Sequence, residues 1–223
     1  MKVIVFGATG MIGQGVLREC LLDRDVDAVL AVGRSATGQQ HPKLREIVHR
    51  DLLDLAPVAD ELAGYDACFF CLGVSSAGMS EADYRRVTYD LTLSAAQLLA
   101  ARNPDMTFIY VSGMGTDSKG RAMWARVKGE TEDALLALPL RAYMMRPGFI
   151  QPMHGIRSRT RLYALLYVVA APLFPILRRL FPNAVTTTGR VGRAMIELAR
   201  SGAPERVLES RDINAVAARS SSP

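Results

Sequence analysis

Hydrophobic residues along the chain follow two alternating patterns. Short runs rich in β-branched and aromatic residues have the length of strands, and the longer segments between them repeat apolar residues at helical spacing. The runs predicted as strands are Lys2–Phe6, Ala28–Gly33, Glu46–His49, Asp66–Leu72, Met106–Ser112 and Arg141–Arg146. The segments predicted as helices are Ile12–Leu22, Ser80–Arg102 and Arg121–Leu138. This alternation predicts βαβ units, whose right-handed crossovers place helices on both faces of a parallel sheet.

After Pro147 the pattern changes, because Tyr163–Leu177 is nearly continuous apolar sequence flanked by arginines. This run is shorter than the roughly 20 apolar residues that span a membrane, and two prolines interrupt it. We expect a helix that covers the substrate side of the fold or forms a subunit contact in a homo-oligomer. The less favoured alternative is contact of residues 161–180 with a membrane surface.

The C-terminal part of the chain returns to an α/β pattern. A helix is predicted over Thr188–Arg200, followed by a short strand at Val207–Ser210. The terminal residues Ala217–Pro223 are expected to fray.

The net charge of +5 and the pI near 9.3 raise the question of a nucleic-acid partner. The excess is arginine scattered over many segments, without the interleaved aromatic residues on which bases stack. We therefore expect no nucleic acid, and an anionic small molecule accounts for the charge equally well. The three cysteines form no disulfide-like spacing and Met1–Phe6 reads as a strand, so a cytoplasmic protein is predicted.

Cys68-Phe69-Phe70-Cys71 has the spacing of a redox or zinc motif. It lies inside an apolar run, however, and residues three apart on a strand point to opposite faces of the sheet. We interpret both cysteines as core residues, and no metal site is expected.

A glycine-rich loop directly follows the first predicted strand and opens the first predicted helix. Gly7 permits a tight turn, Gly10 lets the backbone approach a pyrophosphate, and Gly13 permits close packing of helix on strand. The helix N-terminus presents N–H groups and a positive dipole to phosphates. The loop therefore predicts a nicotinamide dinucleotide site. Its expected cofactor-binding residues are Gly7, Thr9, Gly10, Met11, Ile12 and Gly13.

With this loop, the predicted fold is α/β and of the Rossmann type: a doubly wound parallel sheet with a small C-terminal helical cap on the substrate side. Residues 1–150 are expected to form the cofactor-binding core, and residues 151–223 the cap and closing helix of the same domain. The length of 223 residues fits one such domain.

The residue after the second predicted strand indicates which dinucleotide is bound. NAD-preferring sites place a carboxylate there, whereas this chain has Arg34, whose guanidinium can hold a 2′-phosphate. NADP(H) is therefore favoured, with NAD(H) as the alternative cofactor. Asp51 and Leu52 follow the third strand, where the carboxylate is placed to reach an adenine amino group; a surface carboxylate is the competing interpretation.

These segments resemble the extended and atypical short-chain dehydrogenase/reductase superfamily. Within it, they are most similar to the branch of Tat-interacting-protein-like oxidoreductases, loosely described as NAD(P)-dependent epimerases. The resemblance runs from Met1 to about Ile150. The segments that carry it are Gly7–Gly13, Gly33-Arg34, Cys71-Leu72-Gly73, Val111-Ser112-Gly113, Lys128-Gly129-Glu130 and Arg146-Pro147-Gly148.

The resemblance implies that Leu72 and Gly73 line the ribose and nicotinamide, and that Ser112 and Lys128 occupy catalytic positions. It also implies a catalytic tyrosine four residues before the lysine, but this chain has Trp124 there. An indole N–H donates a hydrogen bond and has no proton to exchange near neutral pH. Lys128 retains the role of binding the ribose hydroxyls. Pro147 ends the sixth strand and steers the chain over the nicotinamide, toward a largely apolar substrate pocket.

The sequence therefore leaves two hypotheses. The first is an NADP(H)-dependent oxidoreductase or epimerase that acts on a small carbonyl or alcohol substrate, with Ser112 polarising the substrate oxygen. The second is a non-catalytic dinucleotide-binding protein with a redox-sensing or regulatory role, which Trp124 keeps open. The other residues considered as proton donors are Tyr84, Tyr89, Tyr110, Asp117 and His154, each of which fits a structural role better.

Overall fold

The computed structural model describes residues 1–156 and 184–219. Its centre is a seven-stranded sheet in which every neighbouring pair of strands is parallel. The strands, in their spatial order, are β3 (Leu44–Val48), β2 (Ala28–Gly33), β1 (Lys2–Phe6), β4 (Ala67–Phe70), β5 (Thr107–Val111), β6 (Arg141–Arg146) and β9 (Val207–Glu209).

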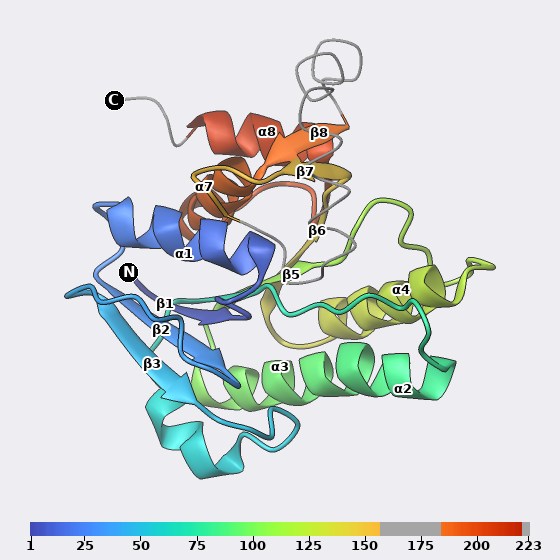
Figure 1. Cartoon of the computed structure of the whole chain (residues 1–223), viewed down its shortest axis with the longest axis horizontal. Helices are drawn as coiled ribbons and strands as arrows, with labels where there is room; N and C mark the ends of the chain where they lie inside the picture. The colour runs from blue at the N-terminus through green and yellow to red at the C-terminus, as the bar shows by residue number, and fades with distance from the viewer. Residues whose placement is uncertain (157–183, 220–223) are drawn as a thin grey trace.

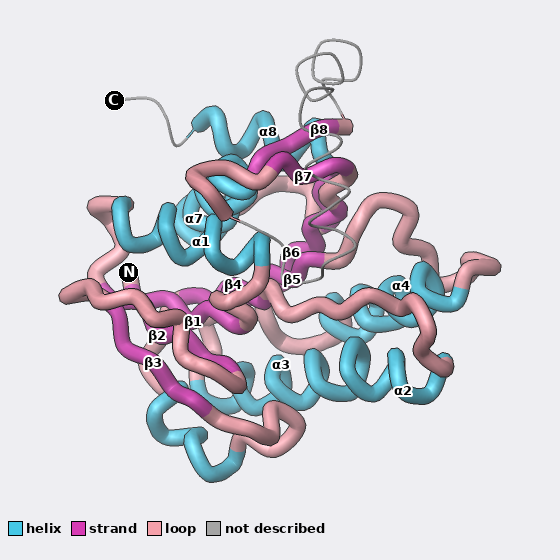
Figure 2. Tube along the Cα trace, viewed as in Figure 1, coloured by secondary structure: helices cyan, strands magenta, loops and turns pink. Residues whose placement is uncertain are grey.

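Helices cover both faces of this sheet, so the predicted doubly wound α/β fold is confirmed (Figures 1 and 2). One face carries α1 (Met11–Leu22), α7 (Thr188–Ser201) and α8 (Ser210–Arg219). The other carries η1 (Ala56–Leu62), α2 (Glu81–Arg85), η2 (Arg86–Asp90), α3 (Leu91–Arg102) and α4 (Met123–Leu136). The segment predicted as one helix over Ser80–Arg102 is helical from Glu81 onward, with a π-helical turn at η2.

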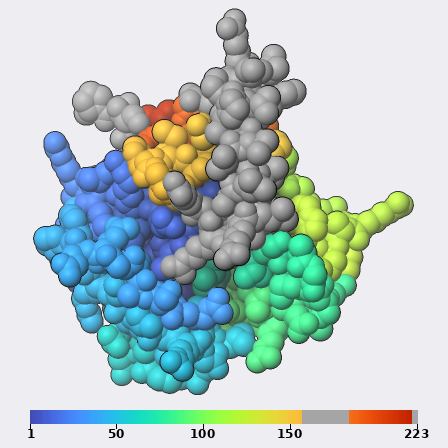
Figure 3. Space-filling view, viewed as in Figure 1, coloured from blue at the N-terminus to red at the C-terminus, as the bar shows by residue number. Residues whose placement is uncertain are grey.

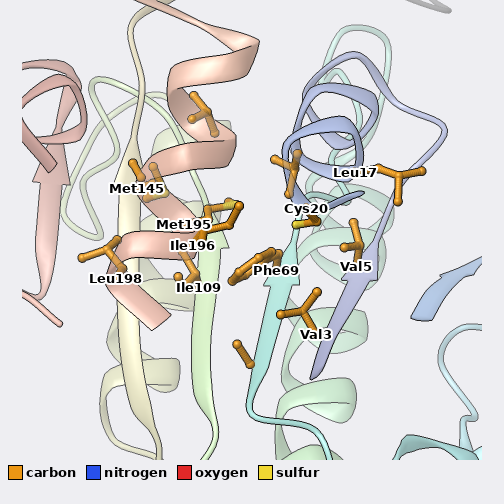
Figure 4. Packing of buried hydrophobic residues seen from close by; sticks show 14 of the residues in the cluster. Val3, Val5, Leu17, Cys20, Phe69, Ile109, Met145, Met195, Ile196 and Leu198 are labelled. Carbon is orange, nitrogen blue, oxygen red and sulfur yellow. The ribbon is translucent and has the colours of Figure 1, made fainter. Parts of the chain in front are cut away.

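The five inner strands, β2, β1, β4, β5 and β6, are buried on both faces, and their alternate residues pack into two separate apolar layers. Val3 and Val5 face α1 and α7, whereas Ile4 and Phe6 face α3. Phe69 points from β4 into the space between α1 and α7 (Figure 4). Because parallel strands are covered on both sides, their sequences read as continuous apolar runs. This is why the sequence located them closely.

The two cysteines of the Cys68–Cys71 spacing lie in different layers. Cys68 is buried with Phe6 and Phe70, whereas Cys71 packs against the layer beneath α1. Both thiols are free, and burial raises the pKa of each, that of Cys71 to about 12. The interpretation of both as core residues is confirmed.

Some elements differ from the prediction. A second, two-stranded parallel sheet, β7 (Phe149–Gln151) with β8 (Val185–Thr187), was not predicted, and neither was η1. The predicted fraying from Ala217 is wrong within the described residues, because α8 runs to Arg219 and buries Val216 and Ala217 against the sheet.

The predicted apolar segment Tyr163–Leu177, with its cap, subunit-contact and membrane-surface interpretations, lies outside the described residues. Within residues 1–156 and 184–219, no helix combines the length and the apolar character needed to cross a bilayer.

Candidate functional site

The glycine loop lies at the carboxyl end of β1, where the direction of the strand order reverses. On one side of β1 the chain continues to β2, and on the other side lies β4. In doubly wound sheets, ligands bind in the crevice at this switch point. The topology therefore places the loop where a dinucleotide binds.

Gly7 and Gly13 are both required by close backbone contacts. Gly7 has a φ of +77°, and a β-carbon there would lie 2.9 Å from the Leu72 nitrogen. A β-carbon on Gly13 would lie 2.0 Å from the Gly7 carbonyl oxygen. Any side chain at either position would displace the loop, because real β-carbons do not approach backbone atoms this closely.

The N-terminus of α1 lacks a side-chain cap from the described residues and has no acidic residue in its first turn. Gly10 is the capping residue, its N–H donates to Gly7 (2.9 Å), and no side chain of the described residues caps the helix. The first turn holds no acidic residue. The N–H groups of Met11 and Ile12 and the helix dipole thus remain available for an anion, which fits a pyrophosphate.

A small pocket opens beside this loop, between β2 and β3. It is lined by Ala8 and Thr9 of the loop and by residues after and beside the two strands, among them Ser35, Thr37 and Glu46. Arg34 lies between the lining residues Gly33 and Ser35 in the sequence, is exposed, and forms no hydrogen bond or ion pair with the described residues. The arginine is therefore free to contact a phosphate on the adenosine half of a cofactor.

Glu46 was not anticipated as a residue of this pocket. Its carboxylate accepts a hydrogen bond from the Thr37 N–H (2.8 Å) and so shapes the chain after β2. Asp51, which was predicted to reach the adenine, is exposed and accepts a hydrogen bond from the Leu53 N–H (3.0 Å) in its own turn. Leu52 is buried in the core, so only its backbone remains available to a ligand.

At the end of β4, Leu72 is half-buried against the glycine loop and Gly73 is exposed. No atom lies within 4 Å of a β-carbon built on Gly73. Among the described residues, Gly73 therefore leaves space at the carboxyl end of β4, and its contact with the ribose and nicotinamide stays a prediction.

The Ser112 hydroxyl points into the protein. Ser112 is 5% exposed, and its hydroxyl donates to the Glu132 carboxylate and lies 3.1 Å from the carbonyl oxygen of Met145. Both partners belong to buried residues, Glu132 and Met145. The role of Ser112 in polarising a substrate oxygen stays a prediction.

Glu132 forms a buried ion pair that holds the ends of three elements together. Its carboxylate, 1% exposed, accepts two hydrogen bonds of 3.1 Å from Arg146 Nε and a further short one from the same guanidinium. These bonds raise the pKa of Arg146 above its ordinary value. Glu132 thus joins α4 to the ends of β5 and β6 through Ser112 and Arg146.

Lys128 lies one helical turn before Glu132 on α4. Its Nζ donates to the Ser112 carbonyl oxygen at the end of β5. Burial disfavours the charged amine and lowers the pKa of Lys128 to about 8, although the Glu132 carboxylate acts in the opposite direction. A β-carbon on Gly113, with a φ of +151°, would lie 4.0 Å from Lys128 Nζ. The residue that faces the lysine is therefore Gly113, which has no side chain.

Trp124 occupies the position of the family tyrosine and is half-buried. Its ring lies over the loop after β5, 3.4 Å from a β-carbon built on Gly115. Gly129, on the same helix, accommodates that loop, since a β-carbon there would lie 2.1 Å from the Ser118 nitrogen. The turn before α4 then projects from the body of the molecule (Figure 3).

The other tyrosines considered as proton donors have structural surroundings. Tyr84 and Tyr110 are buried, and burial raises the pKa of Tyr110 far above its ordinary value. The Tyr89 ring packs under the Arg85 guanidinium at 4.2 Å.

The two remaining candidates lie on exposed turns. Asp117 accepts a hydrogen bond from the Lys119 N–H (2.9 Å), and His154 is exposed with a φ of 57°.

Pro147 ends β6 beside the loop that follows β5. Its carbonyl oxygen accepts from the Met114 N–H (3.0 Å). Gly148 then passes close to β8, where a β-carbon would lie 2.7 Å from the Ala184 carbonyl oxygen. The turn is therefore packed between the loop after β5 and the start of β8, and its place over the nicotinamide stays a prediction.

A large hollow of about 640 Å³ lies at the opposite edge of the sheet, around Asp66, Asn103 and Arg141. Two arginines beside it are already paired, Arg102 with Asp60 and Arg200 with Asp25. Because dinucleotides bind beyond the carboxyl ends of the strands, this hollow is not the cofactor site, despite its size.

Three contributors to the site were missed in the sequence. Glu132 had a signal, since it lies four residues after Lys128 and shares its helix face. Gly113 and Glu46 had none, because their roles depend on side-chain direction and on a loop contact between separate segments.

A family model described as NAD(P)H-binding matches residues 7–153. The chain belongs to this NAD(P)H-binding family. The match includes the glycine loop, Lys128 and Pro147, and it shows that the cofactor is a nicotinamide dinucleotide.

Curated relatives cover much of the chain. Protein FMP52-1, mitochondrial, from Scheffersomyces stipitis is 24% identical over 180 residues, which are 78% of this chain and 79% of the relative. Protein fmp52, mitochondrial, from Emericella nidulans is 30% identical over 169 residues, 72% of this chain and 70% of the relative. The prediction of a cytoplasmic protein is wrong on this finding, because these relatives are named as mitochondrial proteins.

Solved structures share the fold at low sequence identity. The Bordetella bronchiseptica enzyme WbmF in complex with NAD+ has a TM-score of 0.67 at 15% identity, covering 98% of this chain and 77% of the enzyme. A UDP-N-acetylglucosamine 4-epimerase from Methanobrevibacter ruminantium has a TM-score of 0.69 at 17% identity, covering 93% and 75%. Together with the family match, these likenesses confirm the predicted resemblance to the short-chain dehydrogenase/reductase superfamily.

Proposed function

We propose that this chain is an NADP(H)-dependent oxidoreductase or epimerase that acts on a small, partly apolar carbonyl or alcohol substrate. The observation that carries the proposal is the pairing, at one sheet edge, of an uncapped glycine-loop helix with Lys128. The helix offers N–H groups to a pyrophosphate, and Lys128 lies past the neighbouring strand ends, where the reactive half of the cofactor extends. When bound, the cofactor supplies or accepts a hydride.

Arg34 supports NADP(H) over NAD(H). It is exposed directly after β2 and forms no ion pair within the described part of the chain, so its guanidinium can form charge-assisted hydrogen bonds with a 2′-phosphate. Glu46 lies in the adjoining pocket, but its carboxylate is engaged with the Thr37 N–H. Arg34 therefore offers a positive charge to a 2′-phosphate at this end of the site, and the Glu46 carboxylate is an opposing negative charge nearby.

A partly apolar substrate fits the side chains beyond the last strands. Met114 follows β5, and Phe149 and Met153 follow the turn at Pro147; all three are exposed. These residues border the edge toward which the nicotinamide would extend, and apolar walls with few polar groups are common in small-molecule sites.

The experiment follows the loss of NADPH fluorescence with a panel of aldehydes, ketones and quinones. We expect the native protein to consume NADPH with at least one member of the panel. Trp124→Tyr introduces the family hydroxyl, and Trp124→Phe is the matched control, since it keeps an aromatic ring without a hydroxyl. An absence of NADPH consumption by the native protein with every carbonyl would contradict the proposal.

The second candidate function is a non-catalytic, redox-sensing or regulatory dinucleotide-binding protein. Trp124 and Gly113 favour it, because neither offers a hydroxyl beside Lys128. Turnover in Trp124→Tyr alone, with the native protein and Trp124→Phe both inactive, would support this candidate over the enzyme.

A further inference from the structure

The Lys128 amine lies beside the backbone that follows β5. Its Nζ lies beside the bare backbone of Gly113, the Ser112 hydroxyl is turned inward to Glu132, and Trp124 stands where a phenol would be. An ammonium has three N–H groups, and the hydrogen bond to the Ser112 carbonyl oxygen uses one of them. The other two N–H groups donate to no atom of residues 1–156 and 184–219.

The charged groups named near Lys128 lie on two elements, its own helix α4 and strand β6. On its own helix α4 the nearest carboxylate is that of Glu132, which is in turn paired with Arg146 from β6. At the end of β5, the Lys128 Nζ donates a hydrogen bond to the Ser112 carbonyl oxygen. Because Arg146 engages Glu132, Lys128 lacks a full counter-ion of its own.

We propose that Lys128 itself exchanges the proton with the substrate oxygen, in the place that related enzymes give to a tyrosine. This inference rests on the proposed oxidoreductase function and names the group that completes its chemistry. Lys128 donates a hydrogen bond to the backbone at the end of β5, and Gly113, the residue beside its Nζ, has no side chain.

In the reducing direction, the carbonyl carbon accepts a hydride from the reduced nicotinamide as the carbon–oxygen π bond opens. The oxygen takes a proton from the Lys128 ammonium, so that one N–H bond breaks and one O–H bond forms. The substrate is reduced to an alcohol, the nicotinamide is oxidised, and the neutral lysine regains its proton from water. The oxidising direction reverses each transfer.

Burial makes this exchange feasible near neutral pH. A lysine of ordinary pKa holds its proton too tightly to be an efficient acid, and proton transfer is best when the pKa lies near the working pH. The pKa of Lys128 is lowered to about 8, which meets this condition.

The first test measures Lys128 directly, without turnover. The chain has four lysines, so protein labelled with ¹³C at the lysine ε-carbon gives a simple NMR spectrum, in which Lys128→Arg assigns the signal and Lys119→Arg is an exposed control. We expect Lys128 to titrate near pH 8 in the native protein with and without NADP+. Titration at or above pH 10, the range of ordinary lysines, would overturn the proposal.

The second test follows the pH dependence of NADPH-driven reduction of the carbonyl that the panel identifies. The native rate should fall as the pH rises through about 8, because the acid form is lost. Lys128→Arg keeps the cation but cannot release a proton, so kcat should drop by roughly 100-fold or more, with loss of the limb near pH 8 and an NADPH Kd changed only a few fold.

An unchanged pH profile in Lys128→Arg would overturn the role of Lys128 and leave the oxidoreductase proposal intact. If the native protein binds NADPH but reduces no carbonyl, the oxidoreductase proposal itself fails and this inference fails with it. The two failures are therefore distinguishable.

Discussion

At the scale of single residues, the site depends on positions where a side chain would not fit. Gly7 and Gly13 allow the loop, β1 and α1 to lie in contact, and Gly113 places no side chain beside the Lys128 Nζ. The sequence identified the glycine loop because a strand, three glycines and a helix follow in order. It did not distinguish Ser112 from Gly113, because which of two adjacent residues faces the site depends on a positive φ and on a distant buried carboxylate.

Gly13→Ala should destabilise the fold as well as weaken cofactor binding. The added β-carbon would lie 2.0 Å from the Gly7 oxygen, so α1 must move away from β1, at a cost of about 2 kcal/mol or more. Gly33→Ala is the control, because its β-carbon would meet nothing closer than 3.7 Å. Urea unfolding measures both, and equal free energies of unfolding for the two variants would contradict the packing argument.

Arg34→Ala should weaken NADPH binding by roughly 10- to 100-fold, the size of a lost hydrogen bond to a charged group, with little effect on NADH. Glu46→Gln removes a negative charge from the same pocket and should strengthen NADPH binding modestly. Quenching of the fluorescence of Trp124, the single tryptophan, reports both affinities. Equal losses for NADPH and NADH in Arg34→Ala would show that the arginine does not read the 2′-phosphate.

At the scale of secondary-structure elements, Glu132 connects α4 to the ends of β5 and β6. Its buried carboxylate binds both the Ser112 hydroxyl and the Arg146 guanidinium. The Ser112 carbonyl oxygen in turn accepts a hydrogen bond from Lys128. The elements that the sequence located best were the long helices and the doubly covered strands. The three-residue strands β7 and β8 were missed, since pairs this short have no period to recognise and their partners lie far apart in the chain.

Glu132→Gln should lower the free energy of unfolding by about 3 to 5 kcal/mol, because it leaves the Arg146 guanidinium without its buried partner. The double variant Glu132→Gln with Arg146→Met also removes the guanidinium, so it should recover part of the lost free energy of unfolding. The exposed pair Arg45 and Glu61 offers a matched control, in which Glu61→Gln should cost less than about 1 kcal/mol. Chemical denaturation measures the free energy of unfolding of each variant. Equal losses in Glu132→Gln and Glu61→Gln would contradict a structural role for the buried pair.

At the scale of the whole molecule, the stability of the protein should depend on pH through Lys128. The folded pKa, about 8, lies below the ordinary value of 10.5, so the unfolded chain binds more protons between these limits. The folded state therefore bears a cost below pH 8, and this cost disappears as the pH rises toward 10.5.

Comparison with Lys128→Met isolates this contribution from other titrating groups. Relative to the variant, the native protein should gain about 1 to 2 kcal/mol between pH 7.5 and 10, less than the full shift because Lys128 is half-buried. Thermal or urea unfolding across this range measures the difference. A difference between the two proteins that stays constant with pH would rule out a buried, destabilised ammonium.

The central claim is that the carboxyl edge of the sheet binds a nicotinamide dinucleotide through the glycine loop. Calorimetric titration with NADPH tests it most directly in the native protein, Gly10→Val and the control Ala218→Val. Gly10 has an extended backbone that any residue adopts, and a β-carbon there would lie 3.3 Å from the Gly7 carbonyl oxygen, so a small shift of the loop admits valine. The new side chain would fill the approach to the pyrophosphate. We predict saturable binding by the native protein and by Ala218→Val, and its loss in a folded Gly10→Val. Equal NADPH affinity in all three proteins would contradict the assignment of the site.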